Sequence, residues 1–403
     1  MGSVPPAGEP VPPGGRLPDA ALRGVGERPF SLYLHVPFCA TRCGYCDFNT
    51  YTAAELGSAP GSSRDAYLSA VGAELDLAVD VLGQPPVVRT VFFGGGTPTL
   101  LSAAELTGLL AAVRERFEVA PDAEVTTEAN PESVDRDYLD ALVAAGFTRL
   151  SLGMQSSVPH VLAVLERRHT AGRVQQVAGW ARDSGFESLS LDLIYGSPGE
   201  TPADWRSSVE SALALRPDHV SAYSLIVEPG TRLAARIRRK ELPGIDDDVQ
   251  AAYYLIAEEL LTQAGLNAYE VSNWATQGNE CRHNLAYWRS DNWWGIGPGA
   301  HSHVGGVRWW NVRHPSAYSA RLAHRESPAE AREVLEQAQR RMERILLELR
   351  LAEGLDLTLL TGSERGRVAG VVGAGWGHLS DGRLQLTLSG RLLADGISRD
   401  LLD

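Results

Sequence analysis

The stretch Tyr33-Leu34-His35-Val36-Pro37-Phe38-Cys39-Ala40-Thr41-Arg42-Cys43-Gly44-Tyr45-Cys46 decides the fold and chemistry of this chain. It begins as a short apolar strand and continues into a loop with three cysteines spaced C-x3-C-x2-C. Thiolates this close can bind a soft metal centre, and three of them leave one iron of a four-iron cluster without a protein ligand. Structural zinc normally takes four ligands, and no second cysteine pair follows. The spacing therefore favours an iron–sulfur cluster over zinc or three unrelated thiols.

The cysteine loop and its flanks resemble a known superfamily. An aromatic residue before the third cysteine, here Tyr45, is typical of radical S-adenosylmethionine (SAM) proteins. The flanking residues, Tyr33 and His35-Val36-Pro37-Phe38 before the loop and Asp47-Phe48-Asn49 after it, resemble one branch of that superfamily, the HemW heme chaperones. This branch is related to the oxygen-independent coproporphyrinogen III dehydrogenases.

The resemblance implies a cluster and its ligands. In the superfamily three thiolates hold a [4Fe-4S] cluster and SAM chelates the fourth iron, and the matching residues here are Cys39, Cys43 and Cys46. One position departs from the dehydrogenase pattern, which has a further cysteine two residues after the third. This chain has Phe48 there.

Length and composition limit the class of protein. A chain of 403 residues is expected to form two or three domains with a sizeable core. The fourth cysteine, Cys281, is far from the triplet, the start lacks an apolar signal core, and no apolar run approaches the roughly 18 residues of a membrane span. These features predict a cytoplasmic protein, where an oxygen-sensitive cluster can persist. The net charge of −13 argues against nucleic acid as the main partner.

Apolar runs and helical patterns alternate from residue 30 onward. Strands are predicted at 31–35, 89–93, 124–128, 149–152, 188–193 and 220–226. Helical periodicity lies between them at 65–82, 103–117, 134–145, 173–184 and 205–215. Buried parallel strands joined by helices predict an α/β fold. An open, partial (β/α)6 barrel fits this order better than a doubly wound sheet, and it is also the fold that the resemblance implies.

Composition, periodicity and the resemblance together predict four segments along the chain. They are a disordered, Pro/Gly-rich leader at 1–29, a core at 30–245 that the resemblance identifies with the radical SAM barrel, a barrel-capping segment at 246–326, and a C-terminal α+β accessory domain at 327–403 that resembles the C-terminal module of the family. Within the last segment, helical spacing runs over 331–351 and an alternating strand over 383–388. Its wing-like outline could suggest DNA binding, but no recognition helix rich in Lys or Arg is evident.

Unusual residues follow the predicted strands, where α/β barrels collect their chemistry. The cysteine loop follows the first strand and Gly94-Gly95-Gly96-Thr97-Pro98-Thr99 follows the second. The others are Glu128 and Asn130 after the third strand, Gln155 after the fourth, Asp192 at the end of the fifth and Tyr223 in the sixth. Independent runs that point to one face predict a single site there.

The glycine run after the second strand would let a ligand approach the backbone, since no Cβ stands in the way. Alone, such a turn is equally typical of a phosphate loop or of ordinary turn chemistry. Together with the cysteine loop it resembles the run that lines the methionine end of SAM, which assigns Gly95, Gly96 and Thr97. The later run Gly295-Ile296-Gly297-Pro298-Gly299-Ala300-His301-Ser302 predicts a second tight loop over the SAM site.

Four further residues resemble, position by position, those that hold SAM in the family: Glu128, Gln155, Arg167 and Asp192. Carboxylates suit the ribose hydroxyls or the amino group, and a guanidinium suits the methionine carboxylate. Tyr33 and Tyr45 would pack near the sulfonium, because an aromatic face favours positive charge. Each residue alone could be an ordinary strand-end polar group, although Asp192 stands inside an apolar strand, where an unpaired charge is costly.

The segment Arg282-His283-Asn284-Leu285-Ala286-Tyr287-Trp288 matches the H-N-x-x-Y-W stretch that marks HemW proteins. A neutral histidine is a common ligand of heme iron, so His283 is the candidate ligand, with Cys281 as an alternative. The other interpretation is a core or capping histidine, with the nearby tryptophans buried under the edge of the barrel. Aromatic side chains could give a porphyrin a flat apolar surface: Tyr287, Trp288, Trp293 and Trp294.

Two functions follow from the resemblance. The first is a heme chaperone that delivers heme to heme-requiring proteins such as respiratory oxidases, at the inner face of the membrane but without an anchor, with the cluster and SAM as cofactors and no catalytic residue assigned. The second is a dehydrogenase that cleaves SAM to a 5′-deoxyadenosyl radical and decarboxylates coproporphyrinogen propionates. Such an enzyme should surround four substrate carboxylates with cations, and no basic arm is evident. The site residues therefore favour the chaperone over the enzyme.

Overall fold

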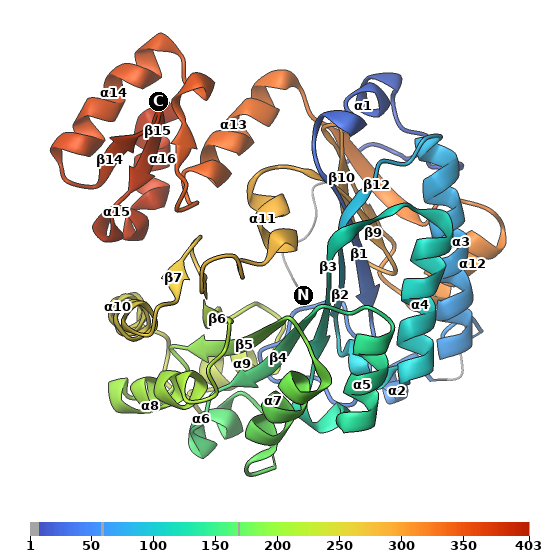
Figure 1. The fold of residues 1–403 in the computed structure, drawn as a ribbon, viewed down its shortest axis with the longest axis horizontal. Coiled ribbons are helices and arrows are strands. Elements are labelled where there is room, and N and C mark those ends of the chain that lie inside the picture. The colour runs from blue at the N-terminus through green and yellow to red at the C-terminus, as the bar shows by residue number, and fades with distance from the viewer. Residues whose placement is uncertain (1–7, 58–59, 168–169, 403) are drawn as a thin grey trace.

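The computed structural model describes residues 8–57, 60–167 and 170–402, and its centre is one curved sheet (Figure 1). Within this described part, twelve strands follow the order β12-β11-β10-β9-β1-β2-β3-β4-β5-β6-β8-β7. Parallel strands in chain order with helical crossovers confirm the predicted partial (β/α)6 barrel. Its strands are β1 (Phe30–Val36), β2 (Val88–Gly95), β3 (Val119–Ala129), β4 (Arg149–Gln155), β5 (Ser188–Tyr195) and β6 (His219–Ser224).

Helices cover the outer face of these strands. Leu32 and Leu34 of β1 are fully buried in the core, whereas Tyr33 between them lines the inner cavity, because successive strand residues point to opposite faces. A capping box of Ser102 and Glu105 begins α4. The outer layer in Figure 1 consists of α3 (Arg64–Leu82), α4 (Ala103–Arg116), α5 (Arg136–Ala144), α7 (Arg173–Ser184) and α8 (Pro202–Leu213).

The remaining helices of the barrel region are shorter or pack at its edges. α10 packs on α8, and α11 lies on the concave side of the sheet (Figure 1). In the described ranges, no helix is both long enough and apolar enough to cross a bilayer. The bounds are α2 (Ala53–Leu56), α6 (Pro159–Val164), α9 (Arg232–Arg238), α10 (Asp247–Gln263), α11 (Arg282–Trp288) and α12 (Pro315–Ala323).

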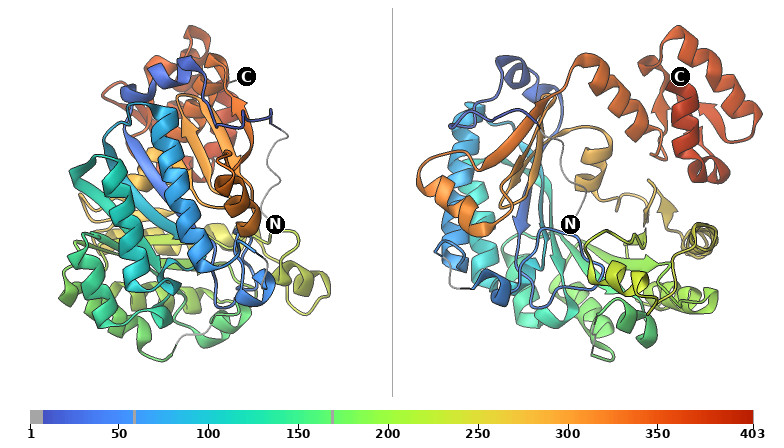
Figure 2. Two further views of the ribbon diagram at one scale, coloured as in Figure 1. Left: turned by 90° about the vertical axis from the view of Figure 1, so that its right-hand side faces the viewer. Right: turned by 180° about the vertical axis from the view of Figure 1, so that it is seen from behind.

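The barrel is open, because its two edge strands pair with other strands instead of with each other. β1 pairs in parallel with β9 (Asn292–Ile296), and the sheet continues antiparallel through β10 (His301–Val304), β11 (Val307–Asn311) and β12 (Ala329–Val334). β6 pairs with β8 (Asn273–Ala275), which is followed by β7 (Asn267–Ala268). Figure 2 shows the antiparallel extension from the side and from behind. The sequence predicted neither β9 nor this extension.

The C-terminal part forms a small domain with its own core, beside the sheet and connected to it through α13 (Figure 2). Its core includes Ile345, Leu384 and Ile397. The α+β composition agrees with the sequence. Its elements are α13 (Gln337–Glu348), α14 (Gly362–Gly373), α15 (Leu388–Leu392), α16 (Ala394–Leu402) and the strands β13 (Leu355–Asp356), β14 (Gly377–Ser380) and β15 (Arg383–Leu386).

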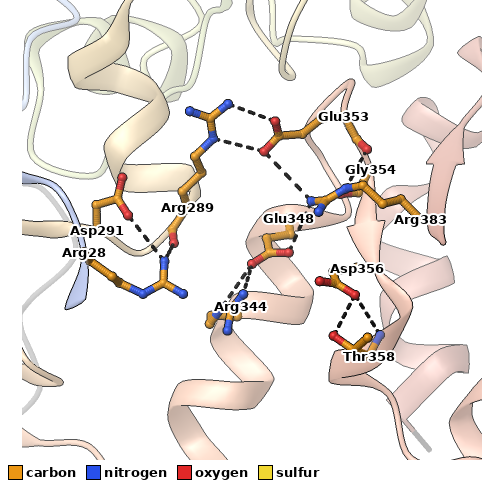
Figure 3. A network of polar contacts seen from close by, with 10 residues as sticks. All are labelled: Arg28, Arg289, Asp291, Arg344, Glu348, Glu353, Gly354, Asp356, Thr358 and Arg383. Carbon is orange, nitrogen blue, oxygen red and sulfur yellow. Dashed lines mark hydrogen bonds and ion pairs between the residues drawn. The ribbon is translucent and has the colours of Figure 1, made fainter. Parts of the chain in front are cut away.

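An ion pair joins this domain to the end of α11. The guanidinium of Arg289 contacts Glu353 at 2.9 Å, and Arg383 lies on the other side of the same carboxylate (Figure 3). Residues 329–334 form the edge strand β12, so the helix predicted over 331–351 is wrong at its start. The strand is favoured there because Ala329 and Ala331 pack their small side chains against the sheet core.

The prediction of a disordered leader is wrong for residues 8–29, and residues 1–7 lie outside the described part. Glu9 pairs with Arg332 of β12, and a short helix, α1 (Asp19–Arg23), packs against the sheet. The side chains of Leu17, Ala21 and Val25 are buried. These three spaced apolar side chains hold the Pro/Gly-rich segment against the core. The composition of the segment alone does not reveal this packing.

Candidate functional site

The inner cavity of the barrel lies where the sequence predicted a site. It measures about 1540 Å³ and runs from the cysteine loop down to α11. The described side chains around it come from all six parallel strands, which confirms that the strand-end residues converge. Those predicted from the sequence are Tyr33, Gly95, Glu128, Asn130, Gln155, Asp192 and Tyr223, and Arg167 joins them.

The three cysteines of the loop are free thiols that line this cavity. Burial, with the charge of neighbouring thiolates, raises the pKa of Cys39 to about 11, and burial raises that of Cys46. A metal centre would reverse this, because a coordinating thiol loses its proton outright. Among the described residues, no three Cys, His, Asp or Glu side chains surround one point that could hold a single metal ion. Three thiols on one loop suit an iron–sulfur cluster, since Cys thiolates are the usual ligands of such clusters.

The glycines after β2 bring that strand against the cysteine loop. An added Cβ at Gly95 would meet the His35 ring at 2.5 Å, and one at Gly96 would overlap the carbonyl oxygen of Phe38. The backbone N–H of Thr97 donates to that same oxygen at 2.8 Å. Gly95 also has a φ of +111°, which L side chains rarely adopt. These glycines therefore let the end of β2 pack closely against His35 of β1 and against the start of the cysteine loop, a role that the sequence did not indicate.

Two carboxyl groups face the cavity below the cysteine loop. Burial, and then the negative charge of Asp192, raise the pKa of Glu128 to about 8. Burial also raises the pKa of Asp192, although the Ser151 hydroxyl donates to it at 2.9 Å. Both pKa values would fall if a cation entered between them. The pair therefore suits a ligand with positive charge, as the ammonium and sulfonium groups of SAM provide.

Arg167 connects the cluster loop to the fourth strand. Its Nη1 lies 3.7 Å from the Cys43 sulfur and its Nη2 donates to the carbonyl of Gly153 at 3.1 Å. Its buried Nε has no hydrogen-bond partner in the described chain. The charge of Arg167 also acts on the neighbouring Tyr45, whose pKa is raised chiefly by burial. Gln155, which ends β4, has a φ of +65° that turns the chain at the cavity wall. A guanidinium with an unused N–H beside the cavity suits a ligand carboxylate.

His283 lies deep in the barrel, at the level of the amino ends of the strands. Its Nδ1 contacts the Thr90 hydroxyl at 2.7 Å and its Nε2 contacts the Tyr287 hydroxyl at 2.9 Å. The side chain is 2% exposed, and its burial lowers its pKa to about 3. The Glu124 carboxylate accepts the backbone N–H of His283 and the Cys281 thiol. Both ring nitrogens of the neutral His283 side chain form hydrogen bonds, as is usual for a histidine buried in a protein core.

The expected flat aromatic surface does not form as one plane. Tyr287 meets Trp293 edge to face, with ring centroids 4.7 Å apart and planes at 79°. Trp294 points the other way and packs against Trp309 in the core, because neighbours in β9 alternate between faces. Trp293 lines a cavity, and Trp288 is half-buried.

An outer cavity of about 1390 Å³, which the sequence did not indicate, lies between the cysteine loop and the strands β9 and β10. Phe48 and Asn49 line it from the loop side, and Trp293, His301 and Arg313 from the sheet side. The amide of Asn49 donates to the carbonyls of Pro298 and Arg313 at 2.9 and 2.8 Å, which ties the two walls together. No signal in the sequence brings residues 250 positions apart to one opening, because β9 and β10 are short and are joined by a glycine-rich loop.

Comparisons with known proteins agree with this geometry. A family model described as the radical SAM superfamily matches residues 33–212. "Heme chaperone HemW" of Mycobacterium tuberculosis is 52% identical over 94% of this chain and 97% of its own length. The protein of the same name from Escherichia coli is 40% identical over 68% of this chain and 70% of its own. The solved structure of coproporphyrinogen III oxidase (HemN) from Escherichia coli matches with a TM-score of 0.80 over 94% of this chain and 92% of that one. Its 24% identity establishes the shared fold alone.

Proposed function

Because the chain belongs to the HemW family of heme chaperones within the radical SAM superfamily, we propose that it binds heme and passes it to heme-requiring proteins. The observation that carries this proposal is the similarity to HemW over almost the whole chain, which extends well beyond the segment shared by all radical SAM proteins. The acceptors we propose are respiratory enzymes at the membrane. We place the chain in the cytosol, because the loop thiols need a reducing compartment.

We propose that the cavity of the barrel holds a [4Fe-4S] cluster and SAM. The thiols of Cys39, Cys43 and Cys46 would bind the cluster, and Arg167 would bind the carboxylate of SAM through its free N–H. When bound, the cluster can supply the electron that cleaves SAM. The described residues would bind and orient the cluster and SAM, and would exclude water from the cavity. The other proposed SAM contacts are Tyr33, Tyr45, Gly95, Gly96, Thr97, Glu128, Gln155 and Asp192.

The residues that face the cavity favour a chaperone over a coproporphyrinogen dehydrogenase. Such an enzyme must neutralise four substrate carboxylates. Of the three arginines that line the outer cavity, Arg42 contacts Glu55 at 3.3 Å and Arg232 contacts Glu166 at 2.8 Å. Arg313 forms no ion pair in the described chain, but one free guanidinium there is too few for four carboxylates. The position of the extra dehydrogenase cysteine is occupied by Phe48, whose side chain is 64% exposed.

One anaerobic experiment separates the two functions. The full chain, reconstituted with iron and sulfide, is titrated with heme and, in parallel, incubated with coproporphyrinogen III, SAM and a reductant. We expect saturable heme binding with a defined Soret band and no protoporphyrinogen IX. Robust protoporphyrinogen formation would reverse the assignment in favour of the enzyme.

The segment 282–288 enters this proposal through its aromatic residues. Tyr287 lines both cavities and packs edge to face against Trp293. Trp288, which follows Tyr287 in the sequence, is half-buried. Direct iron binding by His283 stays a prediction, and it would require one of its two ring hydrogen bonds to break. Cys281 is a weaker candidate, because burial raises the pKa of its thiol to about 12 and its sulfur faces Glu124.

A further inference from the structure

We propose that His301 binds the iron of a heme held in the outer cavity, between the cysteine loop and strands β9 and β10. This inference rests on the proposed chaperone function, because it names the iron ligand of the same cargo. It places the ligand outside the H-N-x-x-Y-W segment, and thus differs from the expectation drawn from the sequence.

The ring of His301 is available for a metal ion. Among the described residues, His35 and His301 are the two histidines that line the outer cavity. The ring of His35 is engaged on both sides, by the Tyr33 hydroxyl at 3.0 Å and by the Asn49 carbonyl at 2.8 Å. His301 is exposed, and no side chain or backbone group of the described chain hydrogen-bonds to its ring. Of these histidines, His301 can therefore bind iron without breaking a bond.

The strands hold His301 in place while leaving its ring nitrogens free. Trp293 Nε1 donates to the His301 carbonyl oxygen at 3.0 Å. An added Cβ at Gly295 would overlap that same oxygen, which explains the glycine opposite it in β9. The His301 ring stacks on Trp310, with centroids 6.0 Å apart and planes at 28°. A ring supported from behind and open in front is a preorganised ligand.

The charges around His301 suit a heme. Arg313 is exposed, lines the outer cavity and forms no ion pair with any described side chain, so its guanidinium can bind a propionate. Partial desolvation at the wall of the outer cavity, and then the positive charges of Arg313 and Arg308, lower the pKa of His301. The neutral imidazole, which is the form that binds iron, is thereby favoured.

Two aromatic side chains give the outer cavity apolar walls. Phe48 projects from the cysteine loop with 64% of its side chain exposed, and Trp293 lies on the sheet side. A large aromatic side chain beside a cavity offers a ligand a wide apolar contact surface. A porphyrin has the flat apolar faces that such walls would cover. Phe48 also occupies the position where the dehydrogenase pattern has a cysteine.

The test compares histidine variants of the full, cluster-loaded chain by heme titration and by absorption and electron paramagnetic resonance spectra. His301→Ala removes the proposed ligand, His283→Ala removes the ligand expected from the sequence, and His378→Ala changes an exposed histidine that lines neither cavity. Iron and sulfide contents and circular dichroism report on folding. Residues that only hydrogen-bond to a metal ligand contribute about 10- to 100-fold to metal affinity. Because His301 would be the ligand itself, we expect His301→Ala to weaken heme binding at least ~10-fold.

We expect the Soret band and the iron spectrum to change in His301→Ala, with free imidazole restoring them, and to stay unchanged in His378→Ala. We also expect His283→Ala to retain the histidine-ligated spectrum. An unchanged spectrum in His301→Ala, with loss of the histidine signature in His283→Ala, would overturn the inference and leave the chaperone function standing. Absence of heme binding by the unmodified chain would instead refute the proposed function, and the inference with it.

Discussion

The substitution Gly95→Ala tests the close contact between the end of β2 and His35 of β1, directly before the cysteine loop. The new Cβ would lie 2.5 Å from Cε1 of His35, where ordinary contacts begin near 3.4 Å. His35 cannot easily yield, because its side chain is 6% exposed and hydrogen-bonded at both ring nitrogens. Overpacking of this kind costs about 1–3 kcal/mol. The φ of +111° at Gly95 adds about 1–3 kcal/mol of backbone strain.

We therefore expect Gly95→Ala to lower the free energy of unfolding by roughly 2–6 kcal/mol and to reduce the iron that the protein retains. The assay is denaturant unfolding of the apoprotein beside iron and sulfide analysis after anaerobic reconstitution. The matched control is Gly108→Ala in α4, an exposed site where an added Cβ meets nothing within 4 Å. It should stabilise the chain by about 0.5–1 kcal/mol. Equal stability and equal iron retention in both variants would refute the close packing described here.

Three further outcomes are expected. Alanine at any of the three loop cysteines should abolish the cluster absorbance, whereas Cys281→Ala should retain it, because that thiol is buried against Glu124 at the opposite end of the barrel; loss of iron in Cys281→Ala would contradict this. Arg167→Lys should weaken SAM binding, measured calorimetrically, more than it lowers the iron content, since a lysine cannot reproduce the fork of a guanidinium. Burial is the main cause that raises the pKa of Glu74 to about 7, so the folded state binds this carboxyl proton more tightly than the unfolded state does. The free energy of unfolding should therefore fall by about 3 kcal/mol as the pH rises from about 4.5 to 7. Glu74→Gln should flatten this part of the profile of unfolding free energy against pH, and an equally steep fall in the variant would show that other groups cause it.

The sequence predicted the parallel half of the sheet because each of those strands is an apolar run set between helical patterns. The site residues on these strands converged for the same reason, since the carboxyl ends of parallel strands share one edge. The extension from β9 to β12 escaped prediction. Its strands are short, the pairing of β9 with β1 joins residues more than 250 positions apart, and the sequence of β12 predicts the start of a helix.

The two candidate histidines show a feature that the sequence does not predict, namely which ring is free to bind iron. His283 stands in a motif and was expected to bind iron, yet its ring is bonded to Thr90, 193 residues away in sequence. His301 stands in a glycine-rich run that predicts a loop, yet it begins strand β10 beside the outer cavity. Which histidine is free depends on tertiary hydrogen bonds, and no local pattern reports them.

The most direct test of the chaperone function is transfer of bound heme. The cluster-loaded chain is saturated with heme, freed of excess, and mixed anaerobically with a heme-free respiratory enzyme, while the Soret spectra of donor and acceptor are followed. We predict that heme leaves the chain and that the acceptor gains its native spectrum faster than it does from the same amount of free heme. Heme that stays on the chain, or that reaches the acceptor no faster than free heme does, would contradict the account.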